Sequence, residues 1–432
     1  ISTLPFVMGK GGESSASLRS GGGASSAKGS SGVAASVSSE VLIDGVWYDV
    51  SSFKHPGGRV LSYYAGRDAT QAYHEFHQRS AKAAKFLKTL PSREAQQSES
   101  ESSKDGLVRD FDELRMQLEK EGFFKPNYAH TVYRLAELAV MCVAGVALWM
   151  QGYKAASVVM IGLMQGRCGW LMHEGGHYSL TGNIKVDRAL QIFLYGTGCG
   201  MSASWWRNQH NKHHATPQKV GYDVDLNTLP LVAFCKDVLK SSHPAALKAW
   251  IKLQPWMFIP VTNQLVGFGW QFYLHPRHII RTKNVAEMAA FAARFAIIGA
   301  LTYALGAGNT AALYLATNTV SFNYIFLNFA VSHTHLPTLQ KHENTDWVRY
   351  AAVHTMNVHS SWWCNWWMAY LNFQIEHHLF PSMPQYRHPI VSPRVRAMFE
   401  KHGVKYDSRG YLEAMHACFS NLKSVGDLAF TG

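Results

Sequence analysis

Three short histidine clusters carry most of the chemistry that this sequence could perform. Each cluster spaces its side chains three or four residues apart, so a helix would turn them to one face. They are HEGGH with His173 and His177, HNKHH with His210, His213 and His214, and QIEHH with Gln374, His377 and His378. Neutral imidazole is the commonest metal ligand and suits iron. Seven histidines are too many for one tetrahedral zinc ion, so the clusters predict a centre with two metal ions.

A separate histidine motif, HPGG, lies near the front of the chain and begins at His55. Pro56 fixes its own backbone and the two glycines permit a tight turn, which would present the imidazole at the tip of the turn. His77, 22 residues later, could bind the same haem iron from the other side, and His74 is the alternative. A haem held by two histidines has no open position for oxygen, so it can only pass electrons.

Composition divides the front of the chain into parts. Residues 1–38 are rich in Ser, Gly and Ala and cannot bury enough apolar surface to fold, so we expect disorder there. Residues 39–92 predict a small domain with a β-hairpin at its start. Residues 93–109 predict a polar linker, and the body of the protein follows over 110–432.

The body contains apolar runs long enough to cross a bilayer. The four predicted spans are 131–150, 154–172, 287–305 and 310–332. A further apolar run at 255–274 contains amide side chains, so we predict an interfacial or re-entrant helix there. All histidine clusters must meet on one face, which requires an even number of spans between them. The basic loop 275–284 places that face in the cytoplasm by the positive-inside rule.

The charge balance is basic, with 41 Lys and Arg against 29 Asp and Glu. Beside long apolar runs, this balance favours a membrane surface with anionic lipid. It does not favour nucleic acid, because the sequence has neither zinc-finger spacing nor an arginine-rich tract. The six cysteines are scattered, with no CxxC pair, which is typical of a reducing compartment.

Taken together, the HPGG motif and the boxes HxxxH, HxxHH and QxxHH resemble the front-end fatty acid desaturases with a fused cytochrome b5 domain. Gln374, in place of the first histidine of the third box, is a mark of that family. The resemblance implies an N-terminal α+β cytochrome b5-like domain followed by an all-α membrane domain. This second domain would have four transmembrane helices, interfacial helices and a cytoplasmic helical cap.

The resemblance also implies cofactors and further ligands. The cofactors would be haem b, on His55 and His77, and two non-haem irons on the clustered histidines. Desaturases of this kind use a histidine and an asparagine outside the boxes, and His333 and Asn357 are the candidates here. Their neighbours His335 and His354 are alternatives. Trp170, Trp205 and Trp206 could line an acyl tunnel or belong to an interfacial aromatic belt.

The implied activity is the introduction of a cis double bond between an existing double bond and the carboxyl end of a polyunsaturated acyl chain. The stretches GRCGWLMHEGGHYSLTGNI and NQHNKHHATPQK are similar to those of microbial Δ5 enzymes acting on twenty-carbon chains. Δ6 or Δ8 desaturation, sphingolipid long-chain-base desaturation or hydroxylation, and a membrane-tethered haem electron carrier are alternatives. The expected partners are an acyl lipid or acyl-CoA, O2 and cytochrome b5 reductase. The expected location is the endoplasmic reticulum membrane, with both termini and the active site in the cytoplasm.

Overall fold

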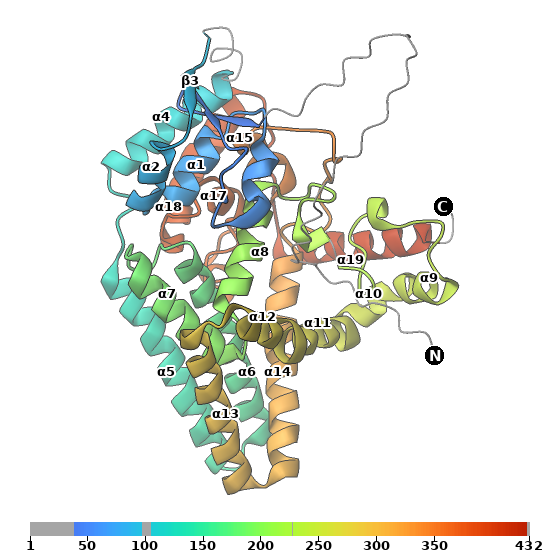
Figure 1. Cartoon of the computed structure of the whole chain (residues 1–432). Helices are drawn as coiled ribbons and strands as arrows, with labels where there is room; N and C mark the ends of the chain where they lie inside the picture. Colours follow the sequence, from blue (N-terminus) through green and yellow to red (C-terminus); the bar gives the residue numbers. More distant parts are fainter. Residues whose placement is uncertain (1–38, 97–104, 227, 430–432) are drawn as a thin grey trace, which may run out of the picture.

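The computed structural model describes residues 39–96, 105–226 and 228–429 (Figure 1). The predicted disordered segment 1–38 lies outside these residues. An α+β unit and a helical cap form one end of the molecule, four long helices form the other end, and an arm of short helices projects from the side (Figure 1).

The N-terminal unit is built on a three-stranded sheet of order β1-β2-β3. Strands β1 (Glu40–Ile43) and β2 (Val46–Asp49) form the predicted hairpin, and β3 (Ser92–Glu94) pairs antiparallel with β2. The sheet therefore extends beyond the predicted domain boundary at residue 92, because β3 completes it. The helices of the unit are η1 (Gly58–Tyr64), α1 (Thr70–His77) and α2 (Ala81–Leu87).

The N-terminal unit shares one hydrophobic core with the cap. The cap helices are α4 (Gly106–Lys120), α15 (Trp347–His354), α17 (Gln374–Leu379) and α18 (His388–Lys401). Buried side chains from both parts pack together, among them Val41, Phe111, Val348 and Phe380. The linker predicted up to residue 109 is shorter in the structure, because the carboxylate of Asp105 caps α4 by accepting the Val108 N–H.

The long helices α5 (Tyr128–Met150), α6 (Lys154–Gly176), α13 (Val285–Leu305) and α14 (Ala307–Ala330) lie side by side (Figure 1). Helices α6 and α14 approach closely because α6 presents glycines. A Cβ atom on Gly166 would lie 2.4 Å from Cδ1 of Tyr324, and one on Gly162 would lie 2.5 Å from Cβ of Val320. Small residues at such contacts are characteristic of helix pairs in membranes.

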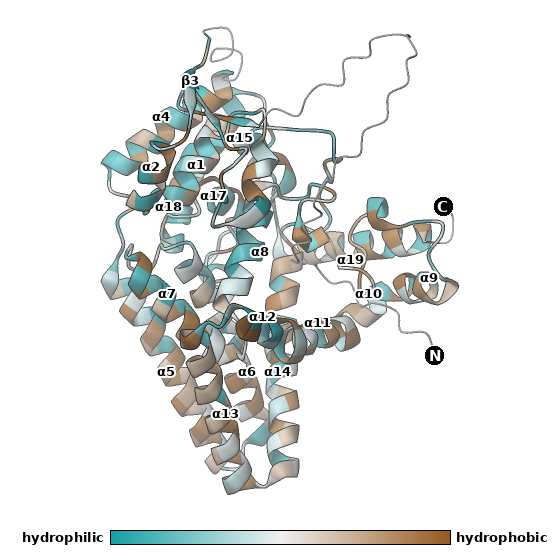
Figure 2. Ribbon diagram, in the orientation of Figure 1, coloured by the Kyte–Doolittle hydropathy of each residue, from teal (hydrophilic) through white to brown (hydrophobic). Residues whose placement is uncertain are grey.

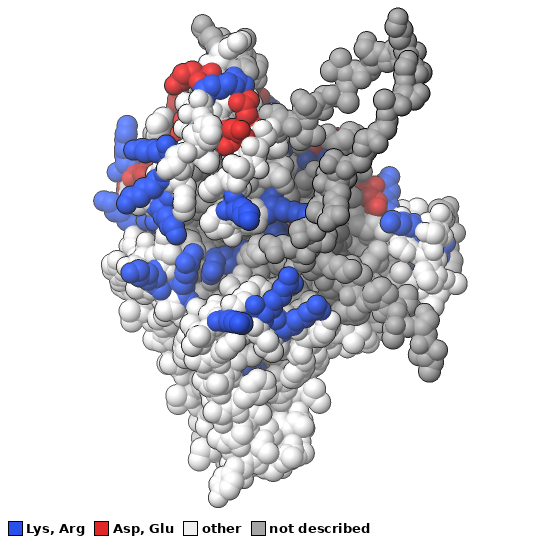
Figure 3. Space-filling model, viewed as in Figure 1, with Lys and Arg blue, Asp and Glu red and all other residues white. Residues whose placement is uncertain are grey.

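The free end of this bundle is apolar. Figure 2 shows mostly brown and white ribbon there, and the face in Figure 3 carries no coloured charge at that end. Among the described helices, α5 and α13 are long and apolar enough to cross a membrane by length and composition. Helices α6 and α14, with 23 and 24 residues, are about as long as α5 and α13. They carry polar side chains, such as Gln165 and Asn318, at buried positions.

The remaining elements connect the bundle to the cap and form the arm. The predicted apolar run 255–274 is a series of short helical pieces in the arm rather than one straight span. The elements are α7 (Ile184–Ile192), η2 (Phe193–Cys199), α8 (Ala203–Ala215), η3 (Val224–Leu226), η4 (Lys236–Val238), α9 (Ala245–Lys252), α10 (Gln254–Met257), η5 (Phe258–Thr262), α11 (Asn263–Gly269), η6 (Trp270–Leu274), α12 (His275–Thr282), β4 (Asn357–Val358), α16 (Trp362–Trp367), η7 (Gln385–Arg387), β5 (Ser408–Arg409) and α19 (Tyr411–Leu428).

Candidate functional site

The three predicted histidine clusters meet between the long helices and the cap. Helix α6 ends at the first cluster, α8 carries the second, and α17 carries the third. Five of their histidines offer ring nitrogens that all lie within 4.8 Å of one another. They are His173, His177, His210, His214 and His377. This first histidine group can hold one metal ion.

A second histidine group lies beside the first and consists of His213, His333 and His378. The ring of His378 stacks on that of His214 at a centroid distance of 4.0 Å, which joins the two groups. His333, predicted as a ligand outside the boxes, therefore lies with the clusters. Gln374 lies next to it, with its Oε1 atom 3.3 Å from Nε2 of His333. The structure thus brings together ligands for two metal ions.

His213 is held by two carboxylates that sequence reasoning did not identify. Its Nδ1 atom lies 3.0 Å from Oδ2 of Asp223 and 3.3 Å from Oδ2 of Asp225. Burial lowers the pKa of the His213 ring, but the two carboxylates outweigh it and raise that pKa to about 9. This ring must therefore release its Nε2 proton when it binds a metal ion. With Nδ1–H bonded to Asp223, Nε2 is the atom left for a metal ion. The signal was absent from the sequence because both aspartates follow in a loop without helical spacing.

The donor atoms fit metal binding. The Nε2 atoms of His177 and His213 and both ring nitrogens of His377 and His378 are buried and make no hydrogen bond within the described part of the chain. Buried polar atoms are normally paired, so these nitrogens require a partner. Burial and the neighbouring imidazoles hold the pKa of His214 and His377 well below the usual range. Neutral rings with free lone pairs are what a metal ion needs.

Asn357 contacts the start of α17, the helix that carries the third cluster. Its amide donates to Glu376 and to the Tyr406 hydroxyl, at 2.7 and 2.6 Å, and its Oδ1 accepts the Ile375 N–H at 2.9 Å. These bonds occupy the amide and fix the start of α17. The geometry therefore indicates that Asn357 positions the helix that carries His377. Its role as a metal ligand stays a prediction.

The other histidines near the centre have different surroundings. His354, an alternative ligand, donates through Nδ1 to the Pro337 carbonyl at 2.7 Å, and neither it nor His335 belongs to a group of convergent ligands. His388, which sequence reasoning missed, is fully buried with its ring centroid 6.1 Å from that of His377. It follows Pro384 in a stretch without box spacing, so no sequence pattern pointed to it.

The HPGG motif places His55 opposite His77. Their ring centroids are 5.9 Å apart, a separation at which one iron can lie between the two rings. A Cβ atom on Gly57 would lie 2.8 Å from Cε1 of His55, which explains the first glycine of the motif. Burial lowers the pKa of both histidines, that of His77 to about 4, so both rings stay neutral. His74 points away and pairs with Asp44 at 2.9 Å.

The N-terminal unit contacts the histidine centre directly. The Tyr64 hydroxyl, at the end of η1, donates to the carbonyl of Ala215 at 2.9 Å, and Ala215 follows His214. On the other side, the Ser382 hydroxyl donates to Gln78 at 2.5 Å, and Gln78 follows His77. The two cofactor sites are therefore joined by short connections through the chain.

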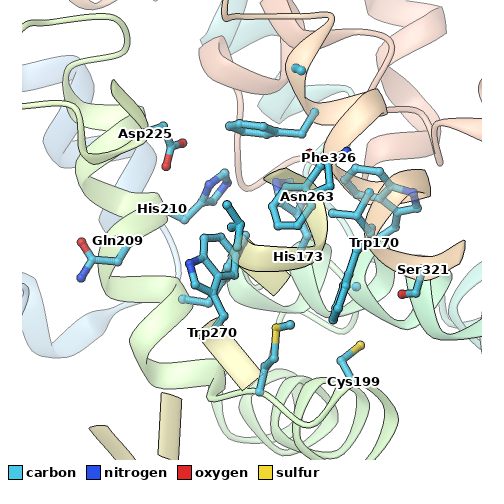
Figure 4. Close-up of a pocket in the computed structure, with 18 of the residues that line it drawn as sticks. Trp170, His173, Cys199, Gln209, His210, Asp225, Asn263, Trp270, Ser321 and Phe326 are labelled. Atoms are coloured by element: carbon cyan, nitrogen blue, oxygen red, sulfur yellow. The ribbon is translucent and has the colours of Figure 1, made fainter. Parts of the chain in front are cut away.

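A cavity extends from the histidine centre between α6, α14 and the arm. His173, His210, His333 and Gln374 line one part of it, and Trp170, Trp205 and Trp206 also line it. Figure 4 shows His173 and His210 in the same wall as Trp170, Trp270 and Phe326. The tryptophans thus belong to the cavity, as the tunnel interpretation predicted. The mostly apolar wall suits an acyl chain.

Comparison with known families agrees with this arrangement. Residues 117–410 match the family described as "Fatty acid desaturase", and residues 36–95 match "Cytochrome b5-like Heme/Steroid binding domain". Both stretches coincide with the two sites, since the first contains the histidine groups and the second contains His55 and His77.

Similarity to named relatives covers most of the chain. It is 56% identical over 388 residues to an "Acyl-lipid (8-3)-desaturase" from Rebecca salina, covering 89% of this chain and 91% of the relative. It is 46% identical over 407 residues to an "Acyl-lipid (8-3)-desaturase" from Thraustochytrium sp, covering 89% and 92%. It is 29% identical over 400 residues to "Fatty acid desaturase 3" from Bos taurus, covering 88% of each.

These matches establish the class of reaction and exclude one of the alternatives raised by the sequence. The protein is an oxygen-dependent fatty acyl desaturase that uses haem b and two non-haem irons. The alternative of a haem electron carrier without desaturase activity is therefore wrong. The chain belongs to the fatty acid desaturase family, in its front-end branch with a fused cytochrome b5 domain.

Proposed function

We propose that this desaturase introduces a Δ5 cis double bond into a twenty-carbon polyunsaturated acyl chain. The observation that carries the proposal is the length of the cavity beside α14. Its wall includes Ala330, one turn from His333, and continues to Asn318. These two residues are 12 positions apart, which is ~18 Å of helix.

That length matches the part of the substrate that must enter the bundle. The polar end of an acyl lipid cannot pass into the apolar bundle, so the methyl end takes the deep part of the cavity. Reaction at carbons 5 and 6 of a twenty-carbon chain leaves about fifteen bonds on the methyl side, or roughly 18 Å at about 1.2 Å per bond.

The names of the two most similar relatives described above support the same position. If "(8-3)" denotes an existing bond at carbon 8 and a new bond three carbons nearer the carboxyl end, the new bond is Δ5. We extend that specificity to this chain on the basis of 56% identity. A Δ8 or Δ6 product is the alternative outcome of the test below.

The residues of the centre divide the work. We propose that the two histidine groups hold the irons, with His213 oriented by Asp223 and α17 positioned by Asn357. Bound iron would supply the oxidant for removing two hydrogens from adjacent methylene carbons. The reaction consumes O2, two electrons and two protons, and it releases two water molecules. The cavity wall excludes water and holds the chain against His173 and Gln374. Electrons reach the haem domain from cytochrome b5 reductase.

We also propose a four-span topology in the endoplasmic reticulum membrane, with the termini and the active site in the cytoplasm. The long helices α5, α6, α13 and α14 would span the bilayer. The arm would lie at its surface, since Trp256, Phe272 and Ile280 are exposed on it beside the basic residues Arg277 and Arg281. The basic segment 275–284, predicted as a loop, is helical over α12 (His275–Thr282). A tag in this segment should be accessible from the cytoplasm, and labelling only from the lumen contradicts this topology.

The function is tested by feeding. Yeast expressing the full chain should convert a twenty-carbon acid with double bonds at 8, 11 and 14 into the product with an added bond at 5, identified by mass spectrometry of derivatised lipids. Eighteen-carbon acids and long-chain bases should remain unchanged. A twenty-carbon acid with double bonds at 11 and 14 is fed in parallel. A new bond at position 8 of that acid, a new bond at position 6 of an eighteen-carbon acid, or a modified sphingoid base would replace the Δ5 assignment.

A further inference from the structure

The cavity wall contains an unusual backbone feature. The three π-helical segments found in the described residues each contribute two side chains to it. The six are Tyr195 and Cys199 from η2, Phe258 and Thr262 from η5, and Trp270 and Leu274 from η6. π-Helical turns are rare and concentrate at functional sites. Their coincidence here indicates that the wall is shaped for its occupant.

Two polar residues in the lining of this cavity each have one side-chain oxygen without a hydrogen-bond partner in the described structure. Gln165 is 8% exposed and Thr262 is fully buried, yet Oε1 of Gln165 and Oγ1 of Thr262 make no hydrogen bond within the described residues. Nearby polar residues of the same wall are satisfied, since Asn263 donates to Asn323 and Asn318 donates to the Tyr314 carbonyl. An unpaired polar group in apolar surroundings is costly. The presence of two such groups in one cavity points to a ligand that pairs with them.

The position of Gln165 on α6 indicates which carbons of the acyl chain lie near it. Gln165 lies eight residues before His173 on α6, which is ~12 Å along the helix. An acyl chain advances about 1.2 Å per bond, so Gln165 lies roughly ten bonds from the reacting carbons on the methyl side. In a chain with double bonds at 8, 11 and 14, the bonds farthest from the reaction centre lie in this stretch.

Cis double bonds offer what a saturated chain lacks. Their π electrons accept weak hydrogen bonds from N–H and O–H groups. A hydroxyl rotates freely, and an amide can turn its NH2 group toward the cavity, because the oxygen and nitrogen of a glutamine side chain occupy equivalent positions. A saturated chain would leave both groups unpaired, and such unpaired polar groups are an effective means of rejecting a competing substrate.

We propose that Gln165 and Thr262 determine specificity by donating weak hydrogen bonds to the cis double bonds on the methyl side of the reaction centre. The enzyme therefore selects polyunsaturated chains over less unsaturated chains of the same length. This inference rests on the proposed function, because it takes the deep cavity to hold the methyl side of the substrate.

The test is a competition within one culture. Yeast expressing the full chain receives equal amounts of two twenty-carbon acids. One has double bonds at positions 8, 11 and 14, and the other has one double bond, at position 8. Both have the same structure near the reacting carbons. The ratio of their two Δ5 products is independent of the amount of enzyme. The wild type should favour the first acid, and Gln165→Leu with Thr262→Val should lower the ratio by about fivefold or more.

Matched controls come from polar side chains outside the cavity. Gln264 and Thr310 also have an unpartnered oxygen in the described structure, and neither lines the cavity. Gln264→Leu and Thr310→Val should keep the wild-type ratio. The single variants Gln165→Met and Thr262→Val are measured beside the double variant, and they decide the question where the double variant is inactive.

The outcomes separate this inference from the proposed function. A wild-type enzyme that forms no Δ5 product from either acid refutes the proposed function. A wild-type preference that stays unchanged in the Gln165 and Thr262 variants refutes only the inference. A parallel loss of both products, at an unchanged ratio, assigns the two residues a structural role and also refutes it.

Discussion

The haem-ligand pair and the histidine centre differ in the distance over which each is assembled. His55 and His77 lie 22 residues apart within one small unit. The ligands of the centre come from α6, α8, α17 and the segment after α14, and they span residues 173 to 378. The first site depends on one local turn and one short helix. The second exists only when the bundle and the cap have packed together.

This difference predicts that the two sites can be lost independently. The haem pair needs the sheet and η1, whereas the centre needs long-range contacts, yet both share the core that joins the N-terminal unit to the cap. Removing a ligand should therefore empty one site and spare the other. Weakening the shared packing should instead slow electron transfer from the haem to the histidine centre.

The largest effect is expected from His377→Ala. His377 belongs to the first histidine group and lies 4.7 Å from His173 and 4.6 Å from His214 between ring centroids. Losing this ligand should reduce product formation at least ~100-fold, with iron content falling and the haem spectrum unchanged. Iron per chain and product are measured on the same preparation. Normal iron and activity would remove His377 from the centre.

The converse change is His77→Ala. It should abolish the low-spin haem spectrum and cut product formation to the level supported by free electron donors, while iron stays bound. His74→Ala is the matched control, because His74 pairs with Asp44 away from His55 and should keep its haem. A normal spectrum in His77→Ala, or haem loss in His74→Ala, would reverse the assignment.

These two sites also differ in how well the sequence predicts them. HPGG and the box spacings single out His55 and the seven clustered histidines, because each motif is local, with helical or turn periodicity. His77 has no motif of its own, and the sequence leaves His74 as the alternative haem ligand. Nothing in the sequence reveals Asp223 or His388, because their proximity to the centre arises from loop and cap packing. Likewise, Asn357 is a candidate ligand only through the family resemblance, and nothing in the sequence reveals that its amide donates to Glu376.

The fold shows the same limit. The hairpin and the positions of the four long helices follow from periodicity and apolar runs, and their ends agree within a few residues. The shared core of the N-terminal unit and the cap could not be predicted, since it joins residues such as Val41 and Val395 that are far apart in the chain. The polar linker suggested that the N-terminal unit is independent. In the structure, this unit shares a hydrophobic core with the cap.

A smaller effect on the centre is expected from Asp223→Asn. The substitution keeps the shape of the side chain but removes the charge that holds Nδ1–H of His213. Iron affinity should fall about 10- to 100-fold, measured by competition with a chelator, and the haem spectrum should not change. Affinity equal to the wild type would show that Asp225 alone orients the ring.

Packing of the bundle is tested by Gly166→Ala. The added methyl would lie 2.4 Å from the Tyr324 ring, which is fixed by a bond from its hydroxyl to the Trp367 carbonyl. Overpacking should lower the free energy of unfolding by about 1–3 kcal/mol, visible as a lower melting temperature in detergent. Gly299→Ala is the control, since its Cβ would meet no atom within 4 Å. Equal melting of both variants would contradict close α6–α14 packing.

The smallest effect tests the connection between the two sites. Tyr64→Phe removes the hydroxyl that donates to the Ala215 carbonyl and leaves that carbonyl unpaired in a buried place, at a cost of about 1–2 kcal/mol. Haem and iron contents should not change, because the ligands of both sites are untouched. The reoxidation of reduced haem in the presence of O2 and substrate should slow a few-fold, because the shared core still holds the unit while its fit against α8 loosens. Tyr63→Phe is the matched control, since Tyr63 contacts Tyr222 through its ring, at 4.9 Å between centroids, and keeps that contact without the hydroxyl. Equal reoxidation rates in both variants would mean that the core alone sets the distance between haem and iron. A slower rate only in Tyr64→Phe would show that one buried hydrogen bond controls electron transfer from the haem site, which is built locally, to the histidine centre, which is assembled over long range.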